Sequence, residues 1–257
     1  MGLTIHYKLR AKGAVGKARK LVENLHQQAH DLPFKEVGKI VDLVGDECDY
    51  EKREKADPLR WLLIQAHGTV SLSHLPRETE HSSHYVSPKR VIAFTAWPGE
   101  GCEESNFGLC QFPATITTER NGKIKTKLDG WCWESFCKTQ YSSDPNCGGV
   151  QNFLRCHLSI IAMLDKAKQL GCLESASDEG EFWEGRNLEA LVKEIGSWNE
   201  MIAAFGGKLK DLIGGAIEMP IANYPDYERL ELAGQSQLPP EMEQLAKLIK
   251  QVCQNPV

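Results

Sequence analysis

Hydrophobic positions near the start of the chain follow two different periods. Residues 3–10 alternate apolar and polar side chains, and this period of two predicts a half-buried strand. Residues 15–32 carry apolar side chains at steps of three and four, which predicts an amphipathic helix that ends before Pro33. Residues 35–44 again favour a strand. Strand, helix and strand in this order are typical of the opening half of a split β-α-β unit.

Short apolar runs predict further strands in the middle of the chain. Residues 60–66 and 90–97 are continuous apolar runs of the kind found in central strands, and residues 131–138 also favour a strand. The polar segment 46–57 precedes the run at 60–66, and the polar segment 74–88 lies between the runs at 60–66 and 90–97. We expect the first to form a surface loop and the second to be irregular.

A hairpin is the clearest local prediction. The segments 114–120 and 123–128 both favour strands, and Asn121-Gly122 stands between them. Asn-Gly accepts the positive φ angles of a type I′ turn, so the sequence predicts a two-residue hairpin turn at this dipeptide.

Three helices are expected in the second half of the chain. Residues 150–170 follow a glycine pair and are apolar around most of the circumference, which predicts a largely buried helix. The next helix begins after Asn187 as N-cap and runs to about residue 212, with a glycine pair at 206–207 that can break or kink it. Residues 241–252 form the third amphipathic segment.

Together these elements predict an α+β fold. We expect an antiparallel or mixed sheet of roughly five to seven strands with split β-α-β, ferredoxin-like character and helices packed on one face. Residues 1–186 would form the sheet domain and residues 187–257 a C-terminal helical extension packed on it, or the two would form one single domain. Core side chains are expected on the apolar stripes of the helices, at Leu25, Phe153, Leu158, Ile161 and Trp198.

The composition narrows the class of protein. Of the 257 residues, 41% are hydrophobic and 25% charged, as in globular proteins. The net charge of −5 argues against a nucleic-acid or acidic-membrane binder, and no apolar run approaches the roughly 20 residues that span a bilayer. The first residues lack the layout of a signal peptide, and the nine cysteines are an odd number. We therefore expect a cytoplasmic protein with reduced thiols and no disulfide.

The cysteines and histidines do not show the spacing of a metal site. Consecutive cysteines from Cys102 to Cys156 include no C-x-x-C pair, and His81 and His84 have no neighbouring thiolate. We assign no metal ligand from the sequence. Cysteines of different loops could still converge, with His157 as a fourth ligand, so a metal-dependent enzyme using Zn or Mg stays open as an alternative.

A candidate ligand site lies between the strand at 131–138 and the following helix. Lys138, Gln140 and Tyr141 stand at the predicted strand end, on the loop that leads to the helix start. Strand ends and glycine-rich helix N-termini often hold anionic or polar ligands. Lysine offers a charge and the other two offer directional hydrogen bonds, although an ordinary solvated loop explains the same residues.

The segment 178–186 adds aromatic and charged side chains to this site. Asp178 or Glu179 would act as a base or a Mg²⁺ ligand, Trp183 would stack on a planar ligand and Arg186 would hold an anion. His157 lies on an apolar helix face, where it is either a buried histidine or a general base. We expect all these residues to line one cleft, while a helix-start loop with core aromatics is the alternative.

These observations predict a class of function rather than a reaction. The chain is expected to bind a small anionic or polar ligand, as an enzyme or as a ligand-binding protein, with no cofactor identified. A metal-dependent enzyme and a non-catalytic interaction or structural protein are the alternatives. The apolar stripe of the helix after Asn187 could also form a homodimer seam.

Overall fold

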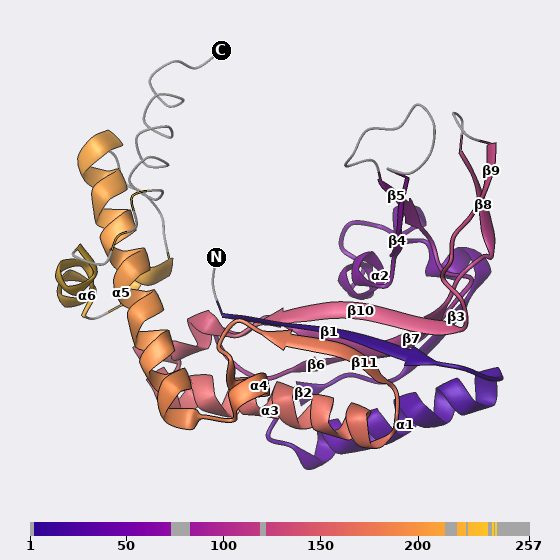
Figure 1. The fold of residues 1–257 in the computed structure, drawn as a ribbon, viewed down its shortest axis with the longest axis horizontal. Helices are drawn as coiled ribbons and strands as arrows, with labels where there is room; N and C mark the ends of the chain where they lie inside the picture. Colours follow the sequence, from indigo (N-terminus) through magenta and orange to yellow (C-terminus); the bar gives the residue numbers. More distant parts are fainter. Residues whose placement is uncertain are drawn as a thin grey trace.

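A seven-stranded antiparallel sheet forms the base of the molecule, with two long helices across one face (Figure 1). The computed structural model of the chain describes residues 3–72, 83–118, 122–213, 220–224, 226–235, 238 and 240. The predicted α+β class and the antiparallel sheet are confirmed.

The strand order places the first strand inside the sheet, one position from its edge. β1 (Thr4–Ala11) lies between β10 and β11, and the sheet continues from β10 through β7 to β6, which pairs with both β2 and β3. The other strands of this sheet are β2 (Glu36–Val37), β3 (Val41–Val44), β6 (Arg90–Trp97), β7 (Ser105–Gln111), β10 (Trp131–Lys138) and β11 (Leu173–Asp178). Three strands separate β1 from β2, so the predicted ferredoxin-like split β-α-β arrangement is not confirmed.

The alternation of β1 divides the sheet into a covered face and an open face. Ile5, Tyr7 and Leu9 are buried beneath the helices, whereas His6 and Lys8 between them are exposed. The helices α1 (Val15–Asp31) and α3 (Gly149–Gln169) lie on the covered face, as their predicted amphipathic pattern requires (Figure 1).

The segment predicted as a strand at 60–66 is a helix, so that prediction is wrong. α2 (Arg60–Gln65) lies on the side of the sheet opposite α1 and α3 (Figure 1). Leu62 and Leu63 are buried, but Trp61 is 44% exposed and Ile64 38% exposed, which is a one-sided helical pattern. A short apolar run has too few turns for its period to separate a buried strand from a buried helix.

One central strand was not predicted at all. β7 carries no alternation because both of its faces are covered, and six of its seven residues are buried. Its central Gly108 is required by close packing, since a Cβ there would lie 2.4 Å from the Cβ of Ala93 in β6. Glycine in the middle of a run weakens the strand signal in the sequence.

Two short ribbons rise from the same end of the sheet (Figure 1). β4 (Gly68–Ser71) pairs with β5 (Ser83–Val86), which falls within the segment predicted to be irregular, and β8 (Thr115–Thr118) pairs with β9 (Gly122–Lys125). The β8–β9 hairpin was predicted, but Thr118 pairs with Gly122, so three residues separate the paired positions. The predicted two-residue turn at Asn121-Gly122 is therefore wrong; the three intervening residues lie outside the described ones.

Loops of the sheet domain contain short helical turns. The acidic segment predicted as a surface loop at 46–57 holds the 3₁₀ turns η1 (Gly45–Cys48) and η2 (Tyr50–Lys52). Between β10 and α3 lie two more, η3 (Gln140–Ser143) and η4 (Pro145–Cys147).

The C-terminal part forms an arm beyond the sheet (Figure 1). After the single turn α4 (Phe182–Gly185), α5 (Leu188–Ile213) begins where the side chain of Asn187 accepts a hydrogen bond of 3.0 Å from the backbone N–H of Ala190, which confirms the predicted N-cap. α5 continues through the glycine pair at 206–207 without ending there. Then follow η5 (Pro220–Asn223) and α6 (Tyr227–Gly234).

The apolar stripe of α5 is used within the chain. Leu191 and Ile195 pack with Leu3 and Phe153, and Ala203 packs with residues of η5 and α6. Part of the stripe is thus covered within the chain, while Leu188 is 45% exposed. A homodimer through the stripe and the boundary at residue 187 stay predictions. The predicted helix 241–252 lies outside the described residues. Among the helices that the structure describes, none has the length and apolar character needed to cross a bilayer.

The helices supply the core side chains mostly as predicted. Leu25, Phe153 and Ile161 are buried, whereas Leu158 and Trp198 are only half-buried. Trp198 packs at the margin of the small cluster beneath α5 rather than in the main core.

Truncation of Leu25 to alanine should lower the free energy of unfolding by about 2–5 kcal/mol, because the side chain is fully buried between α1 and the sheet. Urea denaturation measures this loss. Leu232→Ala is the matched control: its side chain is 71% exposed, and a change above about 0.5 kcal/mol there would contradict the burial pattern.

Candidate functional site

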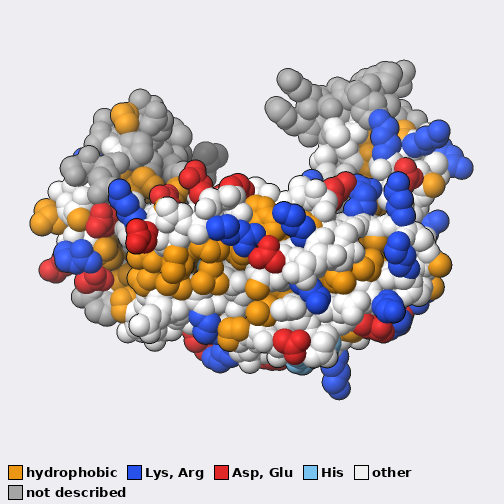
Figure 2. Space-filling model, turned by 60° about the horizontal axis from the view of Figure 1, so that its bottom comes forward, with side chains coloured by type: hydrophobic (Ala, Val, Ile, Leu, Met, Phe, Trp, Pro, Cys, Tyr) orange, Lys and Arg blue, Asp and Glu red, His pale blue; other side chains and the backbone are white. Residues whose placement is uncertain are grey.

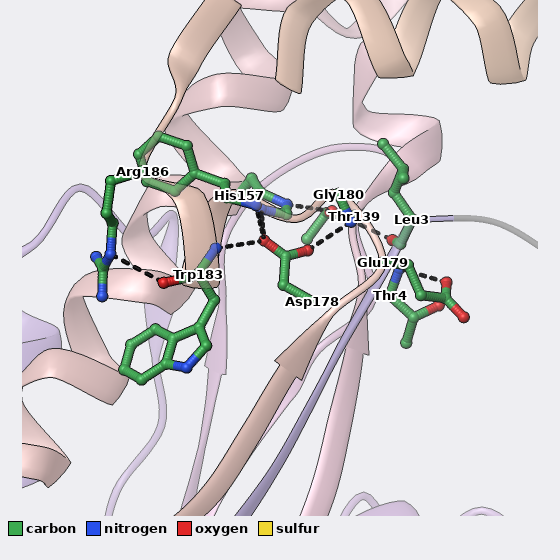
Figure 3. Close-up of polar contacts among 10 residues, drawn as sticks. Leu3, Thr4, Thr139, His157, Asp178, Glu179, Gly180, Trp183 and Arg186 are labelled. Atoms are coloured by element: carbon green, nitrogen blue, oxygen red, sulfur yellow. Dashed lines mark hydrogen bonds and ion pairs between the residues drawn. The ribbon is translucent and has the colours of Figure 1, made fainter. Parts of the chain in front are cut away.

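A sealed polar contact joins α3 to the end of the sheet. His157 of α3 places Nε2 3.0 Å from Oδ2 of Asp178, the last residue of β11 (Figure 3). The other ring nitrogen, Nδ1, lies 3.0 Å from the hydroxyl of Thr139, which follows β10. Neither the His157 nor the Asp178 side chain has exposed surface. Three elements distant in sequence thus meet at one buried histidine.

The remaining acceptor capacity of Asp178 is taken by the backbone. Its Oδ1 accepts from the N–H of Gly180 at 2.8 Å, and its Oδ2 accepts from the N–H groups of Phe182 and Trp183 at 3.1 Å each (Figure 3). Two of these N–H groups belong to the first turn of α4, where helical N–H groups have no partner of their own. The carboxylate therefore caps α4 and orients His157.

The pKa of Asp178 follows from these contacts. Burial by itself would raise the pKa, but the hydrogen bond and charge of His157, together with the N–H groups of Gly180 and Trp183, outweigh burial and lower it. Asp178 is therefore held as a carboxylate, which suits a structural acceptor better than a proton donor.

Glu179 points away from this contact. Its Oε2 accepts a hydrogen bond of 2.9 Å from the backbone N–H of Thr4, and its own N–H donates to the carbonyl of Thr4 at 3.1 Å. The residue is exposed and extends the pairing of β11 with β1 beyond the strand end.

The β1 register separates Lys138 from Asp178. Thr4 pairs with Lys138 and the next residue, Ile5, pairs with Asp178. Because successive side chains leave opposite faces of a strand, Lys138 and Asp178 point to opposite faces of the sheet. The Lys138 ammonium lies 5.0 Å from the ring centroid of Tyr141, so these two predicted ligand residues do contact each other.

Gln140 is buried, and its side-chain amide has no hydrogen-bond partner among the described residues. Within the part of the chain that the structure describes, neither its amide nitrogen nor its oxygen has a hydrogen-bond partner. The same holds for the indole nitrogen of Trp198 and the side-chain oxygen of Asn199, whose amide nitrogen donates to Ser143 at 3.2 Å. Buried polar atoms are normally paired, so the junction of η3 with α5 has unmet hydrogen-bonding capacity among the described residues.

Trp183 and Arg186 also contact each other through their side chains. The Arg186 guanidinium donates to both carboxylate oxygens of Asp165 at 2.8 and 2.9 Å and lies 4.6 Å from the centroid of the Trp183 ring. The indole also has the ammonium of Lys168 at 5.8 Å. Both the predicted anion holder and the predicted stacking surface are thus already engaged within the chain.

The eight predicted site residues fall into two groups of contacts. His157 contacts Asp178, whose carboxylate also accepts from the backbone N–H of Trp183, and Trp183 contacts Arg186. Lys138 contacts Tyr141 elsewhere, and the Gln140 and Glu179 side chains lie apart from both groups. These contacts do not make up one cleft, and a ligand-binding or catalytic role for any of the eight stays a prediction. No cluster of three or more His, Cys, Asp or Glu residues suited to a metal ion occurs in the described ranges.

A groove on the open face of the sheet was missed by the sequence reasoning. It has a volume of about 920 Å³ and runs over β11, β1 and β10, with the segment from α2 to β4 as its wall. Its floor is formed by the outward side chains of the three strands: His6, Lys8, Arg10, Glu134, Phe136, Ser175 and Ser177.

The groove lies where the molecule is hollowed. Figures 1 and 2 show that the α5 arm at one end and the two ribbons at the other rise beyond this face, so that the outline dips between them. The long helices α1 and α3 cover the opposite face. The one signal in the sequence was the polar half of the β1 alternation, which contains two cations, Lys8 and Arg10.

Ion pairs line the groove floor. Lys8 Nζ lies 2.9 Å from Glu134 Oε1, and Arg10 Nε lies 2.6 Å from Glu174 Oε1. The hydrogen bond that Arg10 donates to Glu174 is the main cause that raises the pKa of Arg10, so the guanidinium stays charged. All four side chains keep a large exposed fraction, from 37% for Arg10 to 69% for Glu134. The charges therefore face solvent and can meet a ligand.

The wall of the groove is fixed by a buried polar network. β10 pairs with β7 only at Trp131–Gln111 and Cys132–Cys110. Beyond these two pairs, hydrogen bonds from side chains connect this part of the sheet. Tyr7 and Trp133 both donate to the carbonyl of Asn106, at 2.7 and 2.8 Å.

Gln65 completes this network from α2. Its side-chain oxygen accepts from the Asn106 amide at 2.8 Å and from the Ser135 hydroxyl at 2.6 Å. These two hydrogen bonds hold the end of α2 against the sheet beside the groove.

No family model matches the chain, and neither the curated proteins nor the solved structures contain a match.

Asp178→Asn should destabilise the protein by about 3–5 kcal/mol at neutral pH, because it removes one partner of a buried pair. The pKa of Asp178 in the folded state is lowered below its unfolded value of about 3.9, so its ionisation stabilises the fold above that pH. This contribution is lost as pH falls through the folded pKa. The difference between wild type and variant should therefore be constant above about pH 5 and narrow below about pH 4.

Denaturant unfolding at a series of pH values measures this prediction. Asp165→Asn is the matched control, because its ion pair with Arg186 is exposed and should be worth at most about 1 kcal/mol. A difference for Asp178→Asn that stays constant down to pH 3 would show that its charge does not support the fold.

Proposed function

We propose that the protein binds a small polar ligand with an anionic group in the open-face groove. The observation that carries this proposal is the floor of the groove, where Lys8, Arg10 and the exposed hydroxyls of β11 share one solvent-facing surface. The sequence-predicted acid–base pair, by contrast, has no exposed side-chain surface. The groove volume of about 920 Å³ falls in the range of small-molecule sites, roughly 300–1,000 Å³.

The chemistry of the floor suits a ligand with one anionic end. Arg10 offers N–H donors in a planar fork and Lys8 a compact charge, and both suit carboxylate or phosphate groups. Ser175 and Ser177 add hydroxyl donors on the neighbouring strand, beside Lys8 and His6 in the β1–β11 register. Glu134 and Glu174, which now pair with the cations, would share them with the ligand or bind a cationic group on it.

An apolar side chain gives the groove a surface for the remainder of the ligand. The half-buried Phe136 ring lies 5.9 Å from the His6 ring, and Phe112 and Leu128 lie on the side of the wall. A polar ligand with a planar or apolar portion would therefore be held better than a bare ion.

The same proposal covers an enzyme and a binding protein. Among the described residues of the groove floor, the carboxylates of Glu134 and Glu174 form ion pairs with Lys8 and Arg10. This pairing favours ligand binding over proton transfer. A reducing, cytoplasmic setting is part of the proposal, supported by the odd number of cysteines.

Inorganic phosphate, citrate and adenosine monophosphate are suitable probes, because they present the anionic groups that Lys8 and Arg10 would recognise. We expect at least one of them to raise the Tm of the full chain saturably. At 100 times Kd the gain is about 2.7 kcal/mol, which corresponds to a rise of several degrees for a chain of this size. Differential scanning fluorimetry measures this shift.

Two variants locate the binding. Ser175→Tyr places a ring next to Lys8 in the groove and should abolish the shift, whereas Lys20→Ala, an exposed lysine of α1 on the covered side, should leave it intact. A shift that persists in Ser175→Tyr, or no shift with any of the three probes, would contradict the proposal.

A further inference from the structure

Three thiols meet at the end of the sheet remote from the groove wall. Cys102 lies in the loop after β6, Cys137 in β10 and Cys156 in α3. The Sγ atoms of Cys102 and Cys137 are 3.7 Å apart, and Cys156 also contacts Cys102. All three are free thiols, and no contact described so far uses them.

The backbone holds Cys102 and Cys137 side by side. The N–H of Glu103 donates to the carbonyl of Lys138 at 3.0 Å, which joins the two chain segments next to the thiols. The Cys137 thiol donates to the Glu103 carbonyl at 3.3 Å and the Cys102 thiol to the Lys138 carbonyl at 3.5 Å. The two sulfurs therefore face each other from a bend after β6 and from the end of β10, 35 residues apart in sequence.

This geometry is close to that of a disulfide. A disulfide needs a sulfur–sulfur distance of about 2.05 Å, so rotation of the two side chains must bring the atoms together by less than about 2 Å. Cys102 keeps 9% of its surface exposed, whereas Cys137 and Cys156 are completely buried. A small oxidant thus reaches Cys102 first.

We propose that Cys102 and Cys137 form an oxidation site at which a peroxide produces an intramolecular disulfide. Cys102 first loses its proton, and the thiolate attacks one oxygen of hydrogen peroxide. The O–O bond breaks, Cys102 becomes a sulfenic acid, and the hydroxide that leaves takes up the released proton to form water. The sulfur of Cys137 then attacks the Cys102 sulfur, the S–O bond breaks, and a second water leaves with the Cys137 proton. Two thiols lose two electrons and two protons, and one peroxide is reduced to two waters.

Cys156 is less suited to be the partner. Its thiol is held on α3 between the Arg155 guanidinium at 3.6 Å and the side-chain oxygen of Asn152 at 3.8 Å. The loop before Cys102 also packs closely on it, because a Cβ at Gly99 would lie 3.2 Å from its sulfur. No backbone hydrogen bond joins its chain segment to that of Cys102 in the way that Glu103 joins Lys138.

The environment keeps the pair reduced under mild conditions. The hydrogen bond with Cys137 is the largest cause that raises the pKa of Cys102, and burial raises it further. The thiolate fraction at neutral pH is therefore small, and oxidation should become faster as pH rises. Once formed, the disulfide would tie the loop after β6 to the end of β10.

Peptide mass spectrometry of the full chain tests the proposal. The native protein is treated with hydrogen peroxide, alkylated in denaturant without reductant and digested. We expect one dominant cross-linked peptide pair, Cys102 with Cys137, which disappears after reduction. Cys172, which is buried in the core with its thiol donating to the Ala167 carbonyl, should be recovered as an alkylated thiol.

Variants separate this site from general oxidation. Cys137→Ser should remove the cross-link and leave a Cys102 sulfenic acid that dimedone traps, while Cys172→Ser, another buried thiol, should leave the cross-link unchanged. The proposal is overturned if wild-type protein gives no Cys102–Cys137 peptide even with peroxide in large excess and at a raised pH that favours the thiolate. It is equally overturned if Cys102 joins Cys156 instead.

Discussion

The contact between His157 and Asp178 is the constraint that fixes how α3, the end of β11 and the start of α4 meet. A carboxylate without exposed surface is tolerated only if hydrogen bonds replace its hydration, and Asp178 receives four of them. They come from α3, from Gly180 and from the first turn of α4. Because Asp178 also pairs with Ile5 in the ladder, one side chain fixes the rotation of α3, the register of β11 and the start of α4 together.

One-sided covering of the sheet decides where a ligand can bind. The helices α1 and α3 cover one face, and the acid–base groups on that face are sealed beneath them. The opposite face stays open over β11, β1 and β10, as antiparallel sheets allow, and α2, the ribbons and the α5 arm rise beside it. Polar side chains that solvate an open face are then available as a binding surface, and Gln65 fixes the wall next to them.

Elements with a strong period could be predicted from the sequence, and those without one could not. β1, β10, α1 and α3 follow their patterns closely, whereas α2 is too short to show a helical period and β7 is buried on both faces. The candidate site was harder, since strand register decides which residues meet. His157 was assigned to an apolar helix face, but its contact with Asp178, and the separation of Asp178 from Lys138, both depend on the pairing of β1. The groove joins three strands that are distant in sequence, so no local pattern reveals it.

Apolar packing attaches the α5 arm to the sheet domain, together with the hydrogen bond that Asn199 donates to Ser143. Leu191 and Ile195 are fully buried against Leu3 and Phe153, and each such side chain contributes roughly 1.5–3 kcal/mol. Beside them, the Gln140 amide and two further polar atoms have no partner among the described residues, and an unpaired buried group costs about 1–3 kcal/mol. The two terms are of similar size and opposite sign. The His157–Asp178 contact differs from this junction, because both ring nitrogens and both carboxylate oxygens have partners.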